Sequence, residues 1–148
     1  GIIRLLRERY QPKDVLVQQQ KVARAEALAF VAPVHFLSFP AMLKGYIDRV
    51  FAYGFAYGQG ASLSGKKALC CLTTGGPASS FESDTRGTVL HMLRPVHAGV
   101  FDFCKMDVLP PFVAYGAARL DDTERKEVLI QMDQYLSQIE DTPSLKFD

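Results

Sequence analysis

The chain has no tryptophan, few cysteines and almost no net charge. Lysine plus arginine exceed aspartate plus glutamate by only 17 to 16, giving a net charge of +1. This balance offers no basic surface for nucleic acid or an anionic membrane. Three cysteines without C-x-x-C spacing are not the pattern of a disulfide framework or a zinc site. We therefore expect Cys70, Cys71 and Cys104 to be reduced core residues of a cytoplasmic protein.

Long apolar runs and metal-ligand clusters are also lacking. No run approaches the length of a membrane helix, and the start of the sequence has no signal-peptide pattern. The histidines (His35, His91 and His97) lie in different predicted elements, so we expect no metal site. A length of 148 residues predicts one domain over 1–148 with a substantial core.

Apolar strands alternate with amphipathic helices along the sequence. The predicted elements are, in order, a helix from Pro12 to about Arg24, a strand 27–32, a helix from Pro40, a strand 68–72, a helix from about Gly87, a strand region 106–115 and a helix from Asp121. In the last two helices we expect Leu90 and Leu129 on the buried apolar face. Pro95 should end or kink its helix, and Pro110-Pro111 should break the last strand.

This alternation predicts an α/β fold with a parallel sheet between two layers of helices. Strands 27–32 and 68–72 are apolar almost throughout, as expected of strands covered on both faces. We expect strand 27–32 to be central, yet nothing before it can pair with it. An exposed apolar edge invites aggregation. We therefore expect that N-terminal strands are missing from this sequence, or that a partner chain covers the edge.

Two loops at the carboxyl ends of strands are candidate ligand sites, because ligands bind there in open α/β sheets. Residues 33–37 follow the first strand and offer backbone N–H groups and a flat aromatic ring, which suit a flavin; the alternative is that Phe36 and Leu37 cap the core. The second loop is Thr73-Thr74-Gly75-Gly76, whose glycines allow close backbone approach, although an ordinary turn has the same composition.

Four segments resemble the flavodoxin-like NAD(P)H:quinone oxidoreductases, the DT-diaphorase-like family. They are the loop 33–41, the signature 43–51 followed by Gly54-Phe55-Ala56-Tyr57, the segment 66–76, and the segment 95–100 with Phe103-Cys104. The resemblance runs from about Asp14 onward and corresponds to the C-terminal two-thirds of the family fold. The family's first strand, its phosphate-binding loop and its second strand have no counterpart in this sequence.

The resemblance implies a flavodoxin-like three-layer sandwich that forms a homodimer and binds FMN or FAD. It also implies an enzyme that oxidises NAD(P)H and reduces quinones or similar flat acceptors by ping-pong, two-electron hydride transfer. The implied flavin-binding residues are Pro33, Val34, His35, Phe36, Leu37, Thr73, Thr74, Gly75, Gly76 and Phe81. The hydroxyls and N–H groups of the second loop would stabilise negative charge on a reduced flavin. Phe81 would close over the flavin or pack within its loop.

The resemblance places substrates against Phe55, Tyr57 and Phe103, with Tyr57 as the catalytic residue that stacks on quinone or nicotinamide. Arg86 is a further substrate candidate, because its charge could meet the substrate or the nicotinamide phosphates. Phe55 and Tyr57 would line a slot above the flavin, and Phe103 would enter that slot from the second subunit. Each of these residues has a structural alternative, as a loop anchor, a core residue or, for Arg86, a solvated side chain. A non-catalytic flavodoxin-like ancillary or regulatory dimer subunit is the alternative function, because fold alone does not establish activity.

Overall fold

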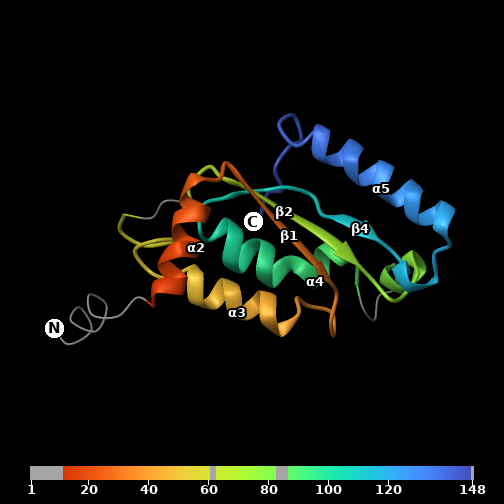
Figure 1. Cartoon of the computed structure of the whole chain (residues 1–148), viewed down its shortest axis with the longest axis horizontal. Helices are drawn as coiled ribbons and strands as arrows, with labels where there is room; N and C mark the ends of the chain where they lie inside the picture. The colour runs from red at the N-terminus through yellow and green to blue at the C-terminus, as the bar shows by residue number, and fades with distance from the viewer. Residues whose placement is uncertain (1–11, 61–62, 83–86, 148) are drawn as a thin grey trace.

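The computed structural model describes residues 12–60, 63–82 and 87–147 and has three layers (Figure 1). The helices and strands are α2 (Lys13–Arg24), β1 (Ala27–Pro33), α3 (Ala41–Val50), β2 (Lys67–Thr73), α4 (Val89–Val96), β3 (Asp107–Val108), β4 (Phe112–Ala114) and α5 (Asp122–Ser137). Helices α2, α3 and α4 pack on one face of the sheet, and α5 packs on the other. The predicted α/β sandwich is confirmed.

Strand β2 is the centre of the described sheet, and every pairing is parallel. β1 pairs with β2 along its whole length, from Ala27 opposite Lys67 to Pro33 opposite Thr73. β3 and β4 pair in turn with the other side of β2, separated at the predicted proline pair. The expectation that 27–32 is central is wrong for the described residues, where β1 pairs only with β2.

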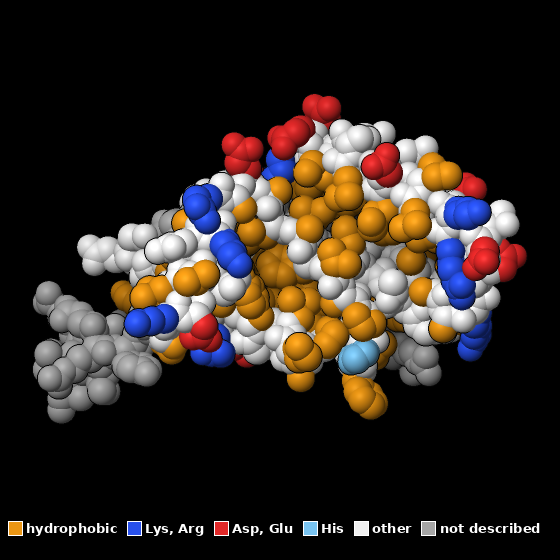
Figure 2. Space-filling model, viewed as in Figure 1, with side chains coloured by type: hydrophobic (Ala, Val, Ile, Leu, Met, Phe, Trp, Pro, Cys, Tyr) orange, Lys and Arg blue, Asp and Glu red, His pale blue; other side chains and the backbone are white. Residues whose placement is uncertain are grey.

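Successive side chains of β2 point to opposite faces of the sheet and so contribute to both hydrophobic cores. Cys70 faces the larger core under α3 and α4, and Cys71 faces the smaller core under α5. Cys70, Cys71 and Cys104 are all buried and free, as expected. Over β1 the covering is thinner, and Val31 is 70% exposed. Figure 2 shows hydrophobic side chains gathered over the middle of the molecule in the view of Figure 1, with charged side chains around the edge.

Helix α4 continues past its proline. Pro95 lies inside the helix, and the chain turns into a wider π-helix over His97–Asp102. A proline has no N–H for the carbonyl four residues earlier, and π-helical turns are a common response to an interrupted helix. The regular helix thus ends one residue after Pro95. Leu90 is 46% exposed, so its predicted place on the buried face is wrong.

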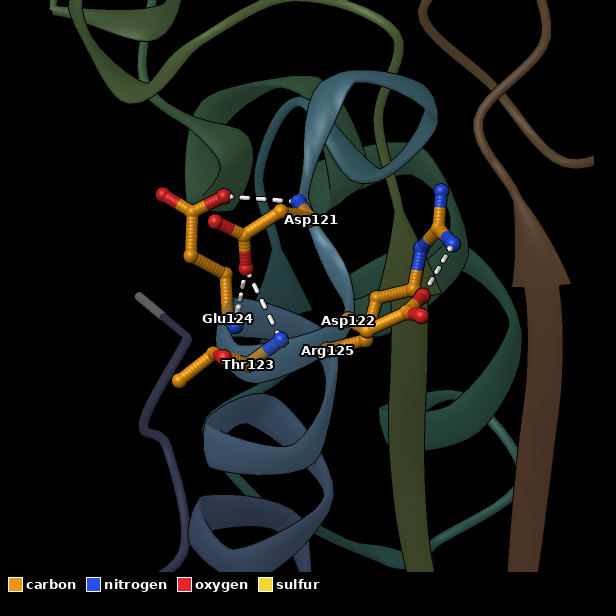
Figure 3. Close-up of polar contacts among 5 residues, drawn as sticks. All are labelled: Asp121, Asp122, Thr123, Glu124 and Arg125. Carbon is orange, nitrogen blue, oxygen red and sulfur yellow. Dashed lines mark hydrogen bonds and ion pairs between the residues drawn. The ribbon is translucent and has the colours of Figure 1, made fainter.

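Helix α5 is fixed at its start and along one side. The Asp121 carboxylate accepts from the N–H groups of Thr123 and Glu124, and the Glu124 carboxylate accepts from the Asp121 N–H (Figure 3). This capping box fits the predicted start. Leu129 is 60% exposed, which corrects its predicted burial. Tyr135 packs inward instead and donates to the Pro110 carbonyl at 2.7 Å.

Helices long and apolar enough to span a bilayer do not occur among the described residues. The same ranges contain no group of three His, Cys, Asp or Glu side chains that could hold a metal ion.

A histidine lies in the larger core. His97 is 1% exposed, its Nε2 is 3.5 Å from the Cys70 sulfur, and its Nδ1 has no partner among the described residues. Burial lowers the pKa of His97 to about 4. Burial, followed by the neighbouring Cys71, raises the pKa of the Cys70 thiol to about 12. Both groups are therefore neutral near pH 7.

We predict that the free energy of unfolding falls as the pH drops from 6.5 to 4. The unfolded chain binds a proton at His97 near pH 6.5, whereas the folded protein resists protonation until about pH 4. The free energy of unfolding is therefore lower at pH 4 than at neutral pH, by up to about 3 kcal/mol. Urea unfolding of His97→Gln should show a flatter pH dependence between these limits. The exposed His91→Gln control should keep the wild-type slope, and an unchanged slope in His97→Gln would contradict the assignment.

Candidate functional site

Three loops meet at the carboxyl end of the sheet. The last residues of β1, β2 and β4 are Pro33, Thr73 and Ala114, and they lie side by side in the strand register. The Val34 N–H donates to the Thr73 carbonyl at 2.8 Å, which joins the first loop to the second. The two loops singled out in the sequence are therefore neighbours in space.

The first loop presents a fully exposed aromatic ring on a strained turn. His35 and Ser38 exchange two backbone hydrogen bonds of 2.9 and 3.0 Å. Between them, Phe36 and Leu37 have φ of 48° and 59°. Two successive left-handed residues form a turn that normally uses Asn-Gly. Each bulky residue costs on the order of 1–3 kcal/mol there.

This geometry excludes the core-capping interpretation of the first loop, and the flavin interpretation stays a prediction. The Phe36 side chain is fully exposed and Leu37 is 42% exposed, so neither caps the core. Phe39 does so instead: it is buried, and its ring stacks on Phe30 with centroids 6.3 Å apart. Phe36 is thus free to contact a ligand. The structure also leaves His35 exposed at the base of the turn.

Thr74 shapes the second loop from inside. Its hydroxyl donates to the Gly76 carbonyl at 2.7 Å and accepts from the Gly116 N–H at 3.2 Å. Its N–H donates to the Ala114 carbonyl at 3.0 Å. The expectation that the Thr74 hydroxyl and N–H serve a ligand is therefore corrected, because both are used within the protein. Thr73, by contrast, is exposed at the end of β2.

The glycines of the second loop leave an open cradle. The N–H groups of Gly75 and Gly76 make no hydrogen bond with any described residue. A Cβ atom added to Gly75 would meet nothing within 4 Å, whereas one on Gly76 would lie 3.3 Å from the Ser80 hydroxyl oxygen. Successive free N–H groups in such a loop form a concave site for negative charge. Gly75 therefore borders the open side of the cradle.

A third loop, at 115–117, was not anticipated from the sequence. Gly116 has φ of 62°, and its N–H donates to the Gly76 carbonyl at 2.9 Å. Burial, and then the nearby Glu82 carboxylate, raise the pKa of the adjacent Tyr115. Phe81 is 8% exposed and packs on Tyr115 with centroids 5.6 Å apart, so it supports the second loop from within. The sequence signal that could have predicted this loop is the glycine directly after the last predicted strand.

The aromatic residues of the proposed substrate slot gather elsewhere. The rings of Tyr57 and Phe103 lie 5.4 Å apart within one chain. They line a hollow of about 570 Å³, and they also border a second hollow of about 270 Å³. The Tyr53 ring meets Tyr57 edge-on at 5.8 Å and lies so close to Gly58 that a Cβ there would approach it to 2.5 Å. This packing holds the Tyr57 loop in place.

The aromatic hollow and the glycine cradle lie at opposite ends of β2. Ser64 and Lys105 line the hollow, and the Lys105 carbonyl accepts from the N–H of Gly65, two residues before β2 begins. The cradle follows the last residue of β2, which is six residues, or about 20 Å, further along. Figure 1 shows the loop between α3 and β2 at one end of the molecule and the strand ends at the other.

One expectation about the slot is therefore corrected: Tyr57 does not cover the strand-end loops of its own chain. Phe103 packs beside Tyr57 within one chain, and its entry into a flavin slot from a second subunit stays a prediction. Phe55 is half-buried against the larger core. Arg86 lies outside the described residues. The predicted order of elements carries a signal for this separation, because in a parallel βαβ unit the loop before a strand lies at the amino edge of the sheet and the loop after it at the carboxyl edge.

Known proteins share this fold and its sequence. A family model described as "Flavodoxin-like fold" matches residues 4–137. The chain is 36% identical over 132 residues to a mouse ribosyldihydronicotinamide dehydrogenase [quinone], covering 85% of this chain and 57% of that protein. It is 34% identical over 110 residues to the glutathione-regulated potassium-efflux system ancillary protein KefF of Enterobacter, covering 74% of this chain and 62% of that protein.

A solved structure extends the comparison to a bound ligand. General stress protein 14 of Treponema denticola, in complex with FMN, superposes with a TM-score of 0.73 at 27% identity, covering 85% of this chain and 71% of that one. The chain spans somewhat more than half the length of the two curated relatives above. The matched residues, the sheet topology and these likenesses agree: the chain belongs to the flavodoxin-like quinone reductase family.

Proposed function

We propose that this chain belongs to a flavin-dependent NAD(P)H oxidoreductase that reduces quinones or similar flat acceptors. The observation that carries the proposal is the open cradle at the strand ends, where the Gly75 and Gly76 N–H groups are free of described partners beside an exposed Phe36. The quinone dehydrogenase relative and the FMN-bound neighbour support it. Buried free thiols fit the proposed cytoplasmic location.

The cradle fits the ring portion of FMN or FAD. The backbone of residues 33–37 would border the ring, and Phe36 would pack on it. Gly75 and Gly76 would direct N–H groups at its polar edge, with Thr73 exposed beside them. A bound flavin supplies the hydride chemistry, while the protein supplies position, exclusion of water and charge stabilisation. No acid or nucleophile is needed from the side chains.

The separation of cradle and hollow favours a homodimer in which the site is shared. The hollow lined by Tyr57 and Phe103 lies beside the start of β2, and the cradle follows the end of this strand, about 20 Å further along it. A twofold pairing can place the aromatic hollow of one copy over the cradle of the other, because such an interface brings the same two patches together twice. NAD(P)H and the acceptor would then occupy this slot in turn, which predicts ping-pong kinetics.

A non-catalytic ancillary subunit remains the second candidate function. The observation that favours it is the likeness to KefF, a protein named as ancillary to a potassium-efflux system. Turnover discriminates the two functions. An ancillary subunit has no need to oxidise NAD(P)H at a useful rate, whereas an oxidoreductase does.

The visible absorbance spectrum of the purified protein tests the proposal first. A bound yellow flavin that bleaches when NAD(P)H is added without oxygen, and recovers its colour on addition of a quinone, is the expected result. A protein that binds neither FMN nor FAD would rule out the oxidoreductase function. A flavin that is bound but stays oxidised in NAD(P)H would favour the ancillary function.

We expect Gly75→Val to abolish flavin retention without unfolding the protein. Space is open around the position, so the new side chain fits the fold but fills the cradle. Equilibrium dialysis with FMN and a melting curve measure the two effects. Gly45→Val is the matched control, because a Cβ at Gly45 also meets nothing within 4 Å, and it should retain flavin. Full flavin content in Gly75→Val would refute the cradle.

Tyr57→Ala should impair turnover while leaving bound flavin largely intact. Tyr57 lies in the aromatic hollow, away from the cradle, so its loss removes stacking surface for the two substrates. We expect kcat/KM to fall roughly tenfold with both NAD(P)H and quinone, the order of magnitude of one stacked aromatic contact. Loss of flavin in proportion to activity would instead place Tyr57 among the flavin-binding residues.

Mixing the two variants tests the shared site. Gly75→Val protomers are inactive alone and Tyr57→Ala protomers keep roughly a tenth of the wild-type activity, but a mixed dimer contains one intact cradle facing one intact hollow. Random mixing should restore about a quarter of the wild-type activity per protomer, because half of the dimers are mixed and each has one good site. Absence of any recovery in dimers shown to be mixed would mean that cradle and hollow serve separately.

A further inference from the structure

The aromatic hollow has a polar end. Its lining combines the rings of Tyr57 and Phe103 with the Ser64 hydroxyl and the Lys105 side chain. The remaining described lining residues are Ala56, Gly58, Gly60 and Cys104, so no carboxylate from the described ranges lines it. Burial raises the pKa of the Cys104 thiol, which keeps that group neutral near pH 7. Lys105 is therefore the charged residue of this lining.

The backbone at Lys105 is held in an unusual conformation. Lys105 has φ of 61°, a left-handed value that favours glycine. Its N–H donates to the Asp102 carbonyl at 2.7 Å, and its carbonyl accepts from the Gly65 N–H at 3.0 Å. A lysine at such a position carries strain that a glycine would avoid. The backbone is fixed from both sides, so the Lys105 side chain leaves it at a defined point beside the hollow.

The Lys105 ammonium has no counter-ion within the described parts of the chain. Lys44 and Lys66 do have partners: Lys44 forms an ion pair with Asp48, and the Lys66 ammonium donates to the Ala23 and Ala25 carbonyls at the end of α2. Lys126 on α5, like Lys105, has none among the described residues, but it does not line the hollow. An unpaired ammonium beside apolar rings favours a ligand that brings its own negative charge.

We propose that Lys105 forms an anion subsite at the end of the aromatic hollow. It binds a negatively charged oxygen group carried by a flat molecule that stacks on Tyr57 and Phe103. Two sources have this chemistry: the phosphate of a reduced nicotinamide nucleotide, and an acidic substituent on a quinone. The subsite rests on the proposed function, in which both molecules use this hollow, and it determines which members of each class are preferred.

Matched ligand pairs test the subsite with Lys105→Met and the exposed α5 control Lys126→Met. The first pair is reduced nicotinamide mononucleotide against the uncharged reduced nicotinamide riboside. The second is a naphthoquinone sulfonate against the neutral naphthoquinone. In flavin-loaded protein, Lys105→Met should lower kcat/KM about fivefold for the charged member of at least one pair, the effect of one partly solvated ion pair, and leave the uncharged member unchanged.

Two further measurements separate charge from structure. Lys105→Gly removes the same ammonium while suiting the left-handed backbone, so it should lose the same preference and melt no lower than wild type. The wild-type preference should shrink as the salt concentration rises, because ions screen the contact. Calorimetric titration with nicotinamide mononucleotide and nicotinamide riboside measures binding without turnover, and only the phosphorylated ligand should depend on Lys105.

The outcomes separate this inference from the proposed function. If Lys105→Met loses the preference for the charged member in the nucleotide pair alone, the subsite binds the nucleotide phosphate. If it loses that preference in the quinone pair alone, the subsite binds the acidic group of the acceptor. Equal effects on charged and uncharged members in every pair, or no effect on any, would overturn the subsite while leaving the oxidoreductase intact. Failure of the wild-type protein to turn over any pair would overturn the oxidoreductase, and the calorimetric comparison would still decide the role of Lys105.

Discussion

Parallel pairing of β2 on both of its edges is the constraint on which the rest of the structure depends. The strand is buried from Ala68 to Leu72 and pairs with β1 on one side and with β3 and β4 on the other. Its two faces supply both cores. Because every described strand runs the same way, the carboxyl ends collect at one edge of the sheet. That common direction creates the site at residues 33–37 and 73–76.

Polar groups at the strand ends divide into those that build the site and those left for a ligand. The Thr74 hydroxyl and the Gly116 N–H both donate to the Gly76 carbonyl, and the Thr74 hydroxyl accepts from the Gly116 N–H. These hydrogen bonds shape the loop before any ligand arrives. The Gly75 and Gly76 N–H groups have no partner among described residues. At Phe36 and Leu37 the chain tolerates left-handed backbone that exposes an aromatic ring. Preorganised donors and strained backbone of this kind typically occur at functional sites.

Distance within the chain is the reason why the proposed function assigns the two halves of the site to different copies. The cradle and the Tyr57–Phe103 hollow lie at opposite ends of the same strand, so one protomer cannot bring them together. In the proposed dimer, activity would depend on association, and Lys105 would be part of the surface that faces the neighbouring cradle. The proposed function, the shared site and the anion subsite thus form one physical argument.

The sequence by itself determined the order and type of the elements, because apolar runs and amphipathic periods are local signals. It located β1, β2 and the proline break between β3 and β4, the α5 start at Asp121, and both strand-end loops. Motifs at 43–57 and 66–76 indicated the family. Only the tertiary structure decided that Leu90 and Leu129 face solvent, that Thr74 bonds internally, and that Tyr57 packs against Phe103. Those features depend on which segments pack together, and sequence spacing carries no information about such packing.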